Sequence, residues 1–317
     1  LATINRKKDM PIIKKTILTS CLALIAFAAN SVLCRLALGN AGIDPAGFTG
    51  VRLLSGAITL SFIVLFFTDT NKLSLPRIFS FANTKGWFAS AMLFFYAAFF
   101  SFAYVKLNTA TGALILFASV QFSMIGVMLC KGHRLHLIEW LGVFISFAGF
   151  ILLMLPSATQ PAFSGFILMV IAGVSWAFYT LVGRDVEDPI LVTSENFIRC
   201  IPIAFVFLLM SLLTYSISWQ GFFYAITSGS VASGVGYSLW YLALKNLSIT
   251  QAAISQLSVP LIAALGGIVF INEALTYELV ISGGLILIGI LVVSLKKNPD
   301  DGRDISNSNE NLSNKNR

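Results

Sequence analysis

The feature that most constrains this chain is a succession of apolar stretches, each long enough to cross a bilayer. A helix needs about 20 mostly apolar residues to span the hydrocarbon core. The chain is 57% hydrophobic and only 11% charged, so these stretches have few polar interruptions, and the sequence predicts a polytopic membrane protein. Ten stretches meet the requirement: residues 16–38, 46–68, 86–105, 109–130, 137–155, 163–183, 191–214, 219–243, 249–271 and 276–295.

The expected fold class is an all-α integral membrane protein. Inside the hydrocarbon the backbone must satisfy its own hydrogen bonds, which restricts a spanning chain to helices or closed barrels. Barrel strands alternate apolar and polar residues over about ten positions. The apolar stretches of this sequence do not alternate in that way, so we expect a helical bundle.

Lysine and arginine predict the orientation of the bundle. Positive residues in short loops mark the cytoplasmic side. If the N-terminus is cytoplasmic, the outer loops carry only Arg35 and Lys106. We therefore expect both termini in the cytosol, with residues 1–15 as a cytoplasmic segment and the Asn/Ser-rich tail 296–317 disordered. The net charge of +7 then reflects topology and attraction to anionic lipid, so we expect the lipid bilayer as a partner and no nucleic acid.

The ten stretches divide into two groups of five with features that recur in order. An Asp-Pro pair occurs at 44–45 and again at 188–189, and an arginine follows a short way into the next helix, as Arg52 and as Arg199. Because five is odd, the two copies insert with opposite topology. We therefore predict two inverted five-helix repeats, residues 16–155 and 163–295. Inverted repeats are typical of secondary transporters.

The end of the second repeat carries the most specific pattern. Residues 258–293 read SVPLIAALGGIVFINEALTYELVISGGLILIGILVV, with a proline, a run of small residues, a glutamate and a glycine-rich last helix. This stretch resembles the closing pattern of EamA-type transporters of the drug/metabolite transporter superfamily, and the resemblance covers residues 16–295. In the first repeat, Val120 stands where a proline is often found and His133 where the glutamate is. The matching positions are Pro260, Gly266, Gly267, Glu273, Gly283, Gly284 and Gly289.

The resemblance implies a ten-helix transporter of the bacterial inner membrane, generally an exporter of amino acids or other metabolites, without naming the substrate. It also implies that the first, third, fourth, sixth, eighth and ninth helices line the cavity. Polar or aromatic residues near the middle of these helices are our candidate substrate-binding residues, and interhelical hydrogen bonding or close packing is the alternative for each. They are Asn30, Tyr96, Gln121, Trp176, Tyr179, Tyr237, Tyr241, Ser255 and Gln256.

Burial arguments support some of these choices. An amide such as Asn30 that faced lipid would be unpaired, so it is expected to point inward. In the eighth helix, Gly229, Ser233, Tyr237 and Tyr241 recur every four residues and predict a single stripe. The amides and hydroxyls together predict a neutral cavity that suits a zwitterion.

Other positions have structural interpretations. Pro260 removes a backbone donor and loosens the preceding turn, so we expect a hinge there. Gly266, Gly267, Gly283, Gly284 and Gly289 are expected to allow close helix packing. Arg52 and Arg199 lie within two turns of a helix end and are interpreted as interface anchors that reach headgroups or pair with an acid, Glu195 for Arg199. Direct substrate contact is the alternative for both arginines.

Several functions remain open at this point. No Asp or Glu lies near a helix midpoint, so a carboxylate relay for protons is not visible. His133, His136 and Glu139 are the only candidates for a membrane enzyme, and we expect no catalysis, metal or cofactor. An exporter of lipophilic or lipid-linked compounds is the runner-up, followed by a non-transporting membrane subunit. Ten helices can close a bundle alone, so a monomer is the default.

Overall fold

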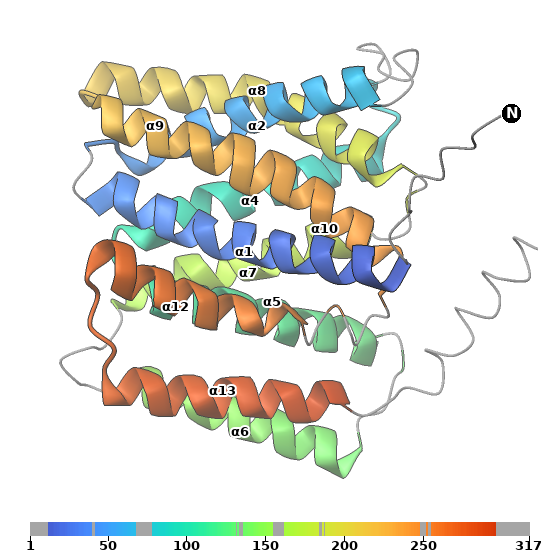
Figure 1. Ribbon diagram of the computed structural model, residues 1–317, viewed down its shortest axis with the longest axis vertical. Coiled ribbons are helices and arrows are strands. Elements are labelled where there is room, and N and C mark those ends of the chain that lie inside the picture. The colour runs from blue at the N-terminus through green and yellow to red at the C-terminus, as the bar shows by residue number, and fades with distance from the viewer. Residues whose placement is uncertain are drawn as a thin grey trace, which may run out of the picture.

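The computed structural model describes residues 12–39, 42–67, 78–130, 136–154, 162–183, 188–247 and 255–295, with the single residues 132, 186 and 252. Across these residues the chain is helical and forms no strand. Figure 1 shows the long helices lying side by side. They are α1 (Ile12–Gly39), α2 (Pro45–Phe67), α4 (Thr84–Tyr104), α5 (Thr109–Cys130), α6 (Leu137–Met154), α7 (Phe163–Gly183), α8 (Pro189–Thr214), α9 (Trp219–Thr227), η2 (Ser228–Val235), α10 (Gly236–Leu244), α12 (Ser258–Ile271) and α13 (Tyr277–Leu295).

Six of these helices, α1, α2, α4, α5, α7 and α8, are long and apolar enough to cross a membrane. Shorter apolar helices cover 137–153, 258–271 and 277–293, and α9, η2 and α10 follow one another without a break from 219 to 244. The ten-helix count therefore stays a prediction. α1 is described from Ile12, four residues before the predicted apolar stretch 16–38, and the boundary at residue 16 stays a prediction. Residues 1–11 and the tail 296–317 lie outside the described residues.

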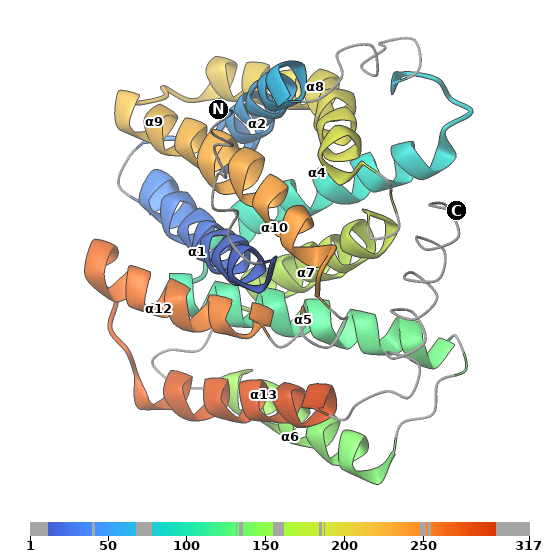
Figure 2. The same cartoon turned by 45° about the vertical axis from the view of Figure 1, so that its right-hand side comes forward.

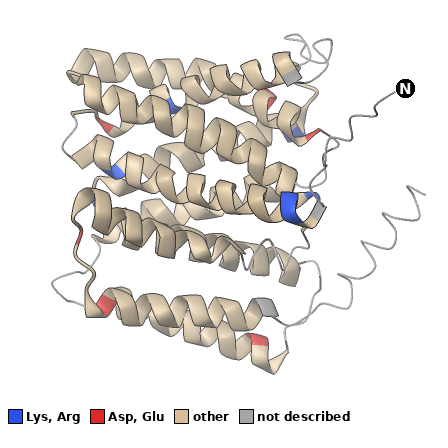
Figure 3. Ribbon diagram, in the orientation of Figure 1, with Lys and Arg blue, Asp and Glu red and all other residues tan. Residues whose placement is uncertain are grey.

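The bundle has two ends. We call the end where α2, α5, α7, α9 and α13 begin the expected outer end, and the end where α1, α4, α6 and α8 begin the expected inner end. Charged residues lie mostly toward these two ends, and long uncharged stretches separate them (Figure 3). Such a distribution suits a bundle whose middle lies in hydrocarbon.

Helices from the first part of the chain pack against helices from the second. The largest contacts join α6 to α13, α2 to α8 and α4 to α7, while α1 lies along α9, η2 and α10. The helix α5 packs against α7 and against α12. Figure 2 shows α6 and α13 together at one edge of the molecule. The two parts of the chain are therefore interleaved and do not form separate domains.

The recurring Asp-Pro pairs begin helices. Asp188 caps α8, where its side chain accepts a hydrogen bond from the Leu191 backbone N–H at 3.2 Å, and Pro189 follows as the first helical residue. Asp44 does the same for α2, accepting from the Gly47 N–H at 3.1 Å. Asp is a favoured N-cap, and Pro suits the first helical position because its missing N–H would have no helical partner there.

The expected close packing at glycine fits the structure at some positions only. A Cβ built at Gly289 of α13 would lie 2.5 Å from the Gly142 carbonyl oxygen of α6, and one at Gly267 would lie 3.1 Å from Thr109 Cβ. At Gly266 it would meet Val32 Cγ2 at 2.6 Å, and at Gly283 it would make an ordinary contact with Leu114 at 3.4 Å. At Gly284 nothing lies within 4 Å, so the packing interpretation is wrong for Gly284.

Candidate substrate site

The centre of the candidate site is a buried arginine. Arg52 of α2 is only 1% exposed. Its Nε donates to Ser233 Oγ of η2, and its Nη2 donates to the hydroxyls of Tyr96 of α4 and Tyr237 of α10, each at 3.1 Å. The guanidinium carbon also lies 5.1 Å from the ring centre of Tyr96 and 5.2 Å from that of Phe100. The arginine therefore joins α2 to α4 and to the η2–α10 run.

This placement corrects the interface-anchor interpretation of Arg52. Its position in the second turn of α2 is close to a helix end, yet its long side chain turns into the bundle and reaches hydroxyls on neighbouring helices. Hydroxyls and aromatic faces lower the cost of the buried charge. They do not neutralise it, because Arg52 takes part in neither ion pair formed among the described residues, Arg35–Glu273 and Arg199–Glu195.

Asn30 of α1 continues the polar cluster. Its Nδ2 donates to the Tyr96 hydroxyl at 3.3 Å, and its Oδ1 accepts from Ser228 Oγ of η2. The amide is 4% exposed and points inward, as an amide in an apolar helix must to find partners. Asn30, Arg52, Tyr96, Ser228, Ser233 and Tyr237 form one connected set, which we call the central polar cluster.

Aromatic rings enclose this cluster. Trp176 of α7 lies 4.8 Å from Tyr96 and 5.0 Å from Tyr237, measured between ring centres. Phe27 of α1 contacts Trp176 and Tyr237 edge-on, each at 5.8 Å. The ring of Tyr179 lies 5.6 Å from that of Trp176 in a tilted arrangement. Of the predicted binding residues, Asn30, Tyr96, Trp176 and Tyr237 therefore come together, with Tyr179 next to Trp176.

The helix that supplies Ser228, Ser233 and Tyr237 has an irregular geometry. Residues 228–235 form a π-helix between α9 and α10. π-helical segments are rare and occur most often at functional sites. Gly229 lies in this segment, and a side chain there would collide with the Arg52 backbone oxygen and with Ser55. The absence of that side chain lets η2 approach α2 closely enough for Ser233 to reach Arg52.

The other predicted binding residues lie outside the central polar cluster. Tyr241 is buried with its hydroxyl against Gly183 of α7. Gln121 of α5 is also buried, at 3% exposure. Ser255 Oγ and Gln256 Nε2 both donate to the Ala252 carbonyl, at 2.9 and 3.4 Å. Their roles stay predictions.

Pro260 is the third residue of α12, which begins at Ser258. Residues 255–256 are helical as well, and Leu257, between them and α12, is a turn residue with right-handed helical dihedral angles. The helical path is therefore interrupted about one turn before Pro260, on the side that a proline loosens. The hinge role of Pro260 stays a prediction.

Arg199 is buried as well, at 3% exposure, so of the two anchor roles expected for it the structure shows the pairing with an acid and not a side chain that reaches outward to headgroups. Its Nη2 pairs with Glu195 at 3.2 Å, the ion pair that the four-residue spacing predicts. Its Nε donates to the Ile78 carbonyl at 2.7 Å and its Nη1 to Asn196 at 3.1 Å. Arg199 therefore ties α8 to the segment that precedes α4, near the expected inner end.

A second charged cluster lies near the expected outer end. Glu273, in the loop after α12, accepts from Arg35 Nε at 3.3 Å and from the Thr109 backbone N–H at 2.9 Å. Arg35 also donates to the Tyr104 carbonyl at 2.9 Å. The carboxylate caps α5 at its N-terminus, where the helix dipole favours a negative charge. We call Arg35, Tyr104, Thr109 and Glu273 the outer latch, because together they join α1, α4, α5 and the loop before α13.

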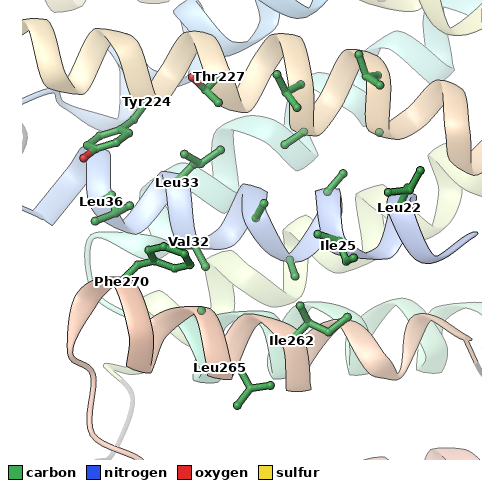
Figure 4. Close-up of a pocket in the computed structure, with 18 of the residues that line it drawn as sticks. Leu22, Ile25, Val32, Leu33, Leu36, Tyr224, Thr227, Ile262, Leu265 and Phe270 are labelled. Carbon is green, nitrogen blue, oxygen red and sulfur yellow. The ribbon is translucent and has the colours of Figure 1, made fainter. Parts of the chain in front are cut away.

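Two spaces differ in size and character. A cavity of about 10 Å³ lies against the central polar cluster, lined by Phe27, Tyr96, Phe100, Leu116, Phe117 and Trp176, which is close to the volume that one water needs. A groove of about 960 Å³ runs along α1 between α9–α10 and α12. Figure 4 shows apolar side chains lining it, among them Leu33 of α1 and Ile262 of α12.

Sequence reasoning missed Ser228 and Phe27, and it ranked a site role for Arg52 second, behind an interface anchor. Ser228 and Phe27 carry no signal that separates them from other serines and phenylalanines of apolar helices. Arg52 had a signal, because a cation inside a spanning helix is costly and most often functional. Because Arg52 lies within two turns of a helix end, the interface-anchor interpretation was preferred over a functional one.

Two of the three residues considered for a membrane enzyme, His136 and Glu139, form part of a helix cap. Glu139 accepts a hydrogen bond from the His136 backbone N–H and so caps the start of α6. His133 lies outside the described residues. Within the part of the chain that the structure describes, no three His, Cys, Asp or Glu side chains group as metal ligands would.

Comparisons with known proteins agree with this architecture. The model of the EamA-like transporter family matches residues 14–155 and again residues 163–295. An uncharacterized protein of Pseudomonas aeruginosa is 40% identical over 280 residues, covering 87% of this chain and 94% of the relative. An uncharacterized transporter of Archaeoglobus fulgidus is 26% identical over 295 residues, covering 89% and 98%. A solved crystal structure shares the fold with a TM-score of 0.58 at 19% identity, covering 87% of this chain and 97% of that one.

Proposed function

Because the chain belongs to the EamA-like transporter family, we propose that it is a secondary transporter that moves a small polar metabolite, an amino acid or close relative, across a bacterial plasma membrane. The observation that carries this proposal is the central polar cluster. A cation, an amide and two tyrosine hydroxyls meet inside a bundle whose helices are apolar. Polar groups of this kind within a membrane mark substrate pathways.

Alternating access between two related halves is the mechanism that we propose. The helix pairs support it. The main contacts stay the same when each first-half helix is exchanged for its second-half counterpart. The counterparts are α1 and α7, α2 and α8, α4 and α9–α10, α5 and α12, and α6 and α13. For example, α4 on α7 becomes α9–α10 on α1. A bundle with this internal symmetry can rock one way or the other around a central site.

The two charged clusters fit this mechanism. The outer latch joins helices near one end, and Arg199 with Glu195 and Ile78 joins helices near the other. With both clusters formed, the central space is about 10 Å³, far below the size of a metabolite. We propose that each cluster opens in turn, so that the central polar cluster faces one side of the membrane at a time.

Counterflow tests the proposal most directly. The purified protein is reconstituted in liposomes, preloaded with an unlabelled compound and diluted into the same compound carrying a radiolabel, across a panel of amino acids and common metabolites. Accumulation of label without an ion gradient is the expected result for at least one compound. Lack of accumulation across the panel would contradict a carrier of small polar metabolites.

A second candidate is export of a lipophilic compound, and the apolar groove along α1 favours it (Figure 4). Its lining residues include Leu22, Ile25, Val231, Leu265 and Phe270, which suit an acyl chain or a drug-like body and not a zwitterion. Transport of a fluorescent lipid analogue that is blocked by Val231→Trp, with no counterflow of polar metabolites, would favour this candidate. Failure of both assays would favour a non-transporting subunit.

A further inference from the structure

We infer that the substrate of the proposed transporter is recognised through a single anionic group, a carboxylate, which accepts a hydrogen bond from Nη1 of Arg52. The inference rests on the proposed function and assigns the substrate class. It also replaces the neutral, zwitterion-binding cavity that the amides and hydroxyls of the sequence suggest.

Arg52 brings a full positive charge into the bundle. Arginine is effectively always protonated inside proteins, so this charge is present whatever the surroundings of the side chain. The groups that receive its hydrogen bonds are three neutral hydroxyls, of Tyr96, Ser233 and Tyr237. Neither of the ion pairs among the described residues includes it. A buried cation without a counter-ion favours binding of an anion.

Two buried donors near the cavity have hydrogen-bonding capacity left over. Arg52 Nη1 is buried and has no hydrogen-bond partner among the described residues. The indole N–H of Trp176 is buried without a partner too, and Trp176 lines the cavity beside Tyr96 and Phe100. Both unpaired groups are donors. Buried donors without acceptors are costly, and a ligand that brings acceptor oxygens removes that cost.

Arg52 is held differently from Arg199 and Arg35. Arg199 is equally buried, but Glu195, Asn196 and the Ile78 carbonyl receive its hydrogen bonds. Arg35 is paired with Glu273. Arg52 differs from both because its partners are hydroxyls, which can turn toward a ligand, and because one nitrogen is left over. If Arg52 only held helices together, we would expect a carboxylate partner for it, as Glu195 is for Arg199.

The surroundings of the cavity suit an apolar body for the rest of the substrate. Phe27, Phe100, Phe117 and Leu116 line the cavity with Tyr96 and Trp176, so the body of the ligand meets aromatic and aliphatic surface. No described Asp or Glu joins the central polar cluster, so an ammonium group would find no acidic partner there. The site therefore suits a carboxylate on an apolar body, and an amino group is dispensable.

Three related probes separate these features: 3-phenylpropionate has the carboxylate alone, L-phenylalanine has both charged groups, and 2-phenylethylamine has the ammonium alone. Thermal unfolding of the purified full-length protein reports binding, and counterflow in liposomes reports transport. We expect 3-phenylpropionate to raise the midpoint temperature and to exchange at least as well as L-phenylalanine. We expect no response to 2-phenylethylamine.

Variants of Arg52 connect the response to this residue. Arg52→Gln is expected to weaken binding of 3-phenylpropionate about 10- to 100-fold, the range for loss of a hydrogen bond to a charged group. Arg52→Lys keeps the charge but not the planar donor array, so it should retain part of the affinity. If Arg52→Gln does not fold, two measurements still test whether the carboxylate is recognised: the affinity of the lysine variant, and the comparison of the three probes on the unaltered protein.

The outcomes also separate this inference from the proposed function. Exchange of 2-phenylethylamine in place of the carboxylates, or unchanged affinity in Arg52→Gln, would overturn the inference and leave a transporter. Stabilisation by chloride alone, with no response to 3-phenylpropionate, would overturn the carboxylate assignment. Stabilisation by 3-phenylpropionate without counterflow would support the binding site and contradict the transport function.

Discussion

Two tyrosine hydroxyls contact Arg52, and they differ in how many donors depend on them. The Tyr96 hydroxyl accepts from both Arg52 and Asn30, whereas the Tyr237 hydroxyl accepts from Arg52. Removing an acceptor leaves each buried donor unpaired, at about 1–3 kcal/mol per group. We therefore expect Tyr96→Phe to lower the thermal unfolding midpoint in detergent more than Tyr237→Phe, its matched control. Equal midpoints in the two variants would contradict this account.

Single residues also show where sequence reasoning succeeds and fails. Asn30 was predictable as an inward-facing residue because an amide that faced lipid would be unpaired. Tyr96 was selected by its position near the middle of its helix, and Tyr237 by the four-residue stripe that includes Ser233. Arg52 was placed at the interface because its depth was judged along its own helix. The partners that hold it, Ser233 and Tyr237, lie about 180 positions later in the chain, and their proximity is a property of the fold.

At the scale of elements, the contact of α13 with α6 depends on Gly289. A Cβ there would lie 2.5 Å from the Gly142 carbonyl and 2.6 Å from the Ser146 backbone nitrogen. We expect Gly289→Ala to push the two helices apart and to cost about 1–3 kcal/mol, as overpacking does. Gly284→Ala on the same helix is the control, because nothing lies within 4 Å of its Cβ position. Thermal unfolding compares the two, and equal stability would contradict the packing.

The outer latch offers a second test at this scale. Glu273→Ala removes the acceptor of Arg35 and of the Thr109 N–H, so the expected outer end should open more often. Cys34, fully buried beside Arg35 in α1, reports this opening. In a background that lacks the exposed Cys21 and Cys130, we expect a thiol reagent to modify Cys34 about tenfold faster, since loss of charged hydrogen bonds exceeds about 1.4 kcal/mol.

The control for this experiment is within the same protein. Cys200 of α8 is also buried and donates to the Ser90 carbonyl near Arg199, far from Glu273 along the bundle. Its modification rate should stay the same in Glu273→Ala. A similar acceleration at both cysteines would indicate general loosening and would count against a latch at one end.

Local structure was predictable where a side chain determines it. The Asp-Pro pairs mark helix starts because capping and the missing proline N–H act within one turn. The π-helix at Ser228–Val235 was not predictable. The four-residue spacing of Gly229, Ser233 and Tyr237 assumes α-helical geometry. In a π-helix the backbone hydrogen bonds join residues five apart instead of four. Tertiary contacts, here the close approach of η2 to Arg52, decide where this change occurs, so it leaves no periodic pattern in the sequence.

At the scale of the whole molecule, the charge pattern predicts which end faces the cytosol. Lys106 and Arg35 lie near the expected outer end, and far more lysines and arginines belong to the loops and termini at the other end. Cys130 is exposed at the last residue of α5, near the expected inner end. A variant that keeps Cys130 alone should therefore react with a membrane-impermeant maleimide only after the cells are permeabilised.

The matched variant carries its single cysteine at the opposite end, as Lys106→Cys, an exposed position that follows α4. It should react in intact cells. The two results together decide the orientation, because a reversed bundle would exchange them. Lys106 precedes the first residue of α5 and Cys130 is its last, so the two positions lie at opposite ends of that helix. Labelling of both from outside would therefore contradict a bundle in which α5 spans the membrane. The expected pattern would assign Glu273 and Arg35 to the outer side, and the outer latch would then close the path by which an exported carboxylate leaves.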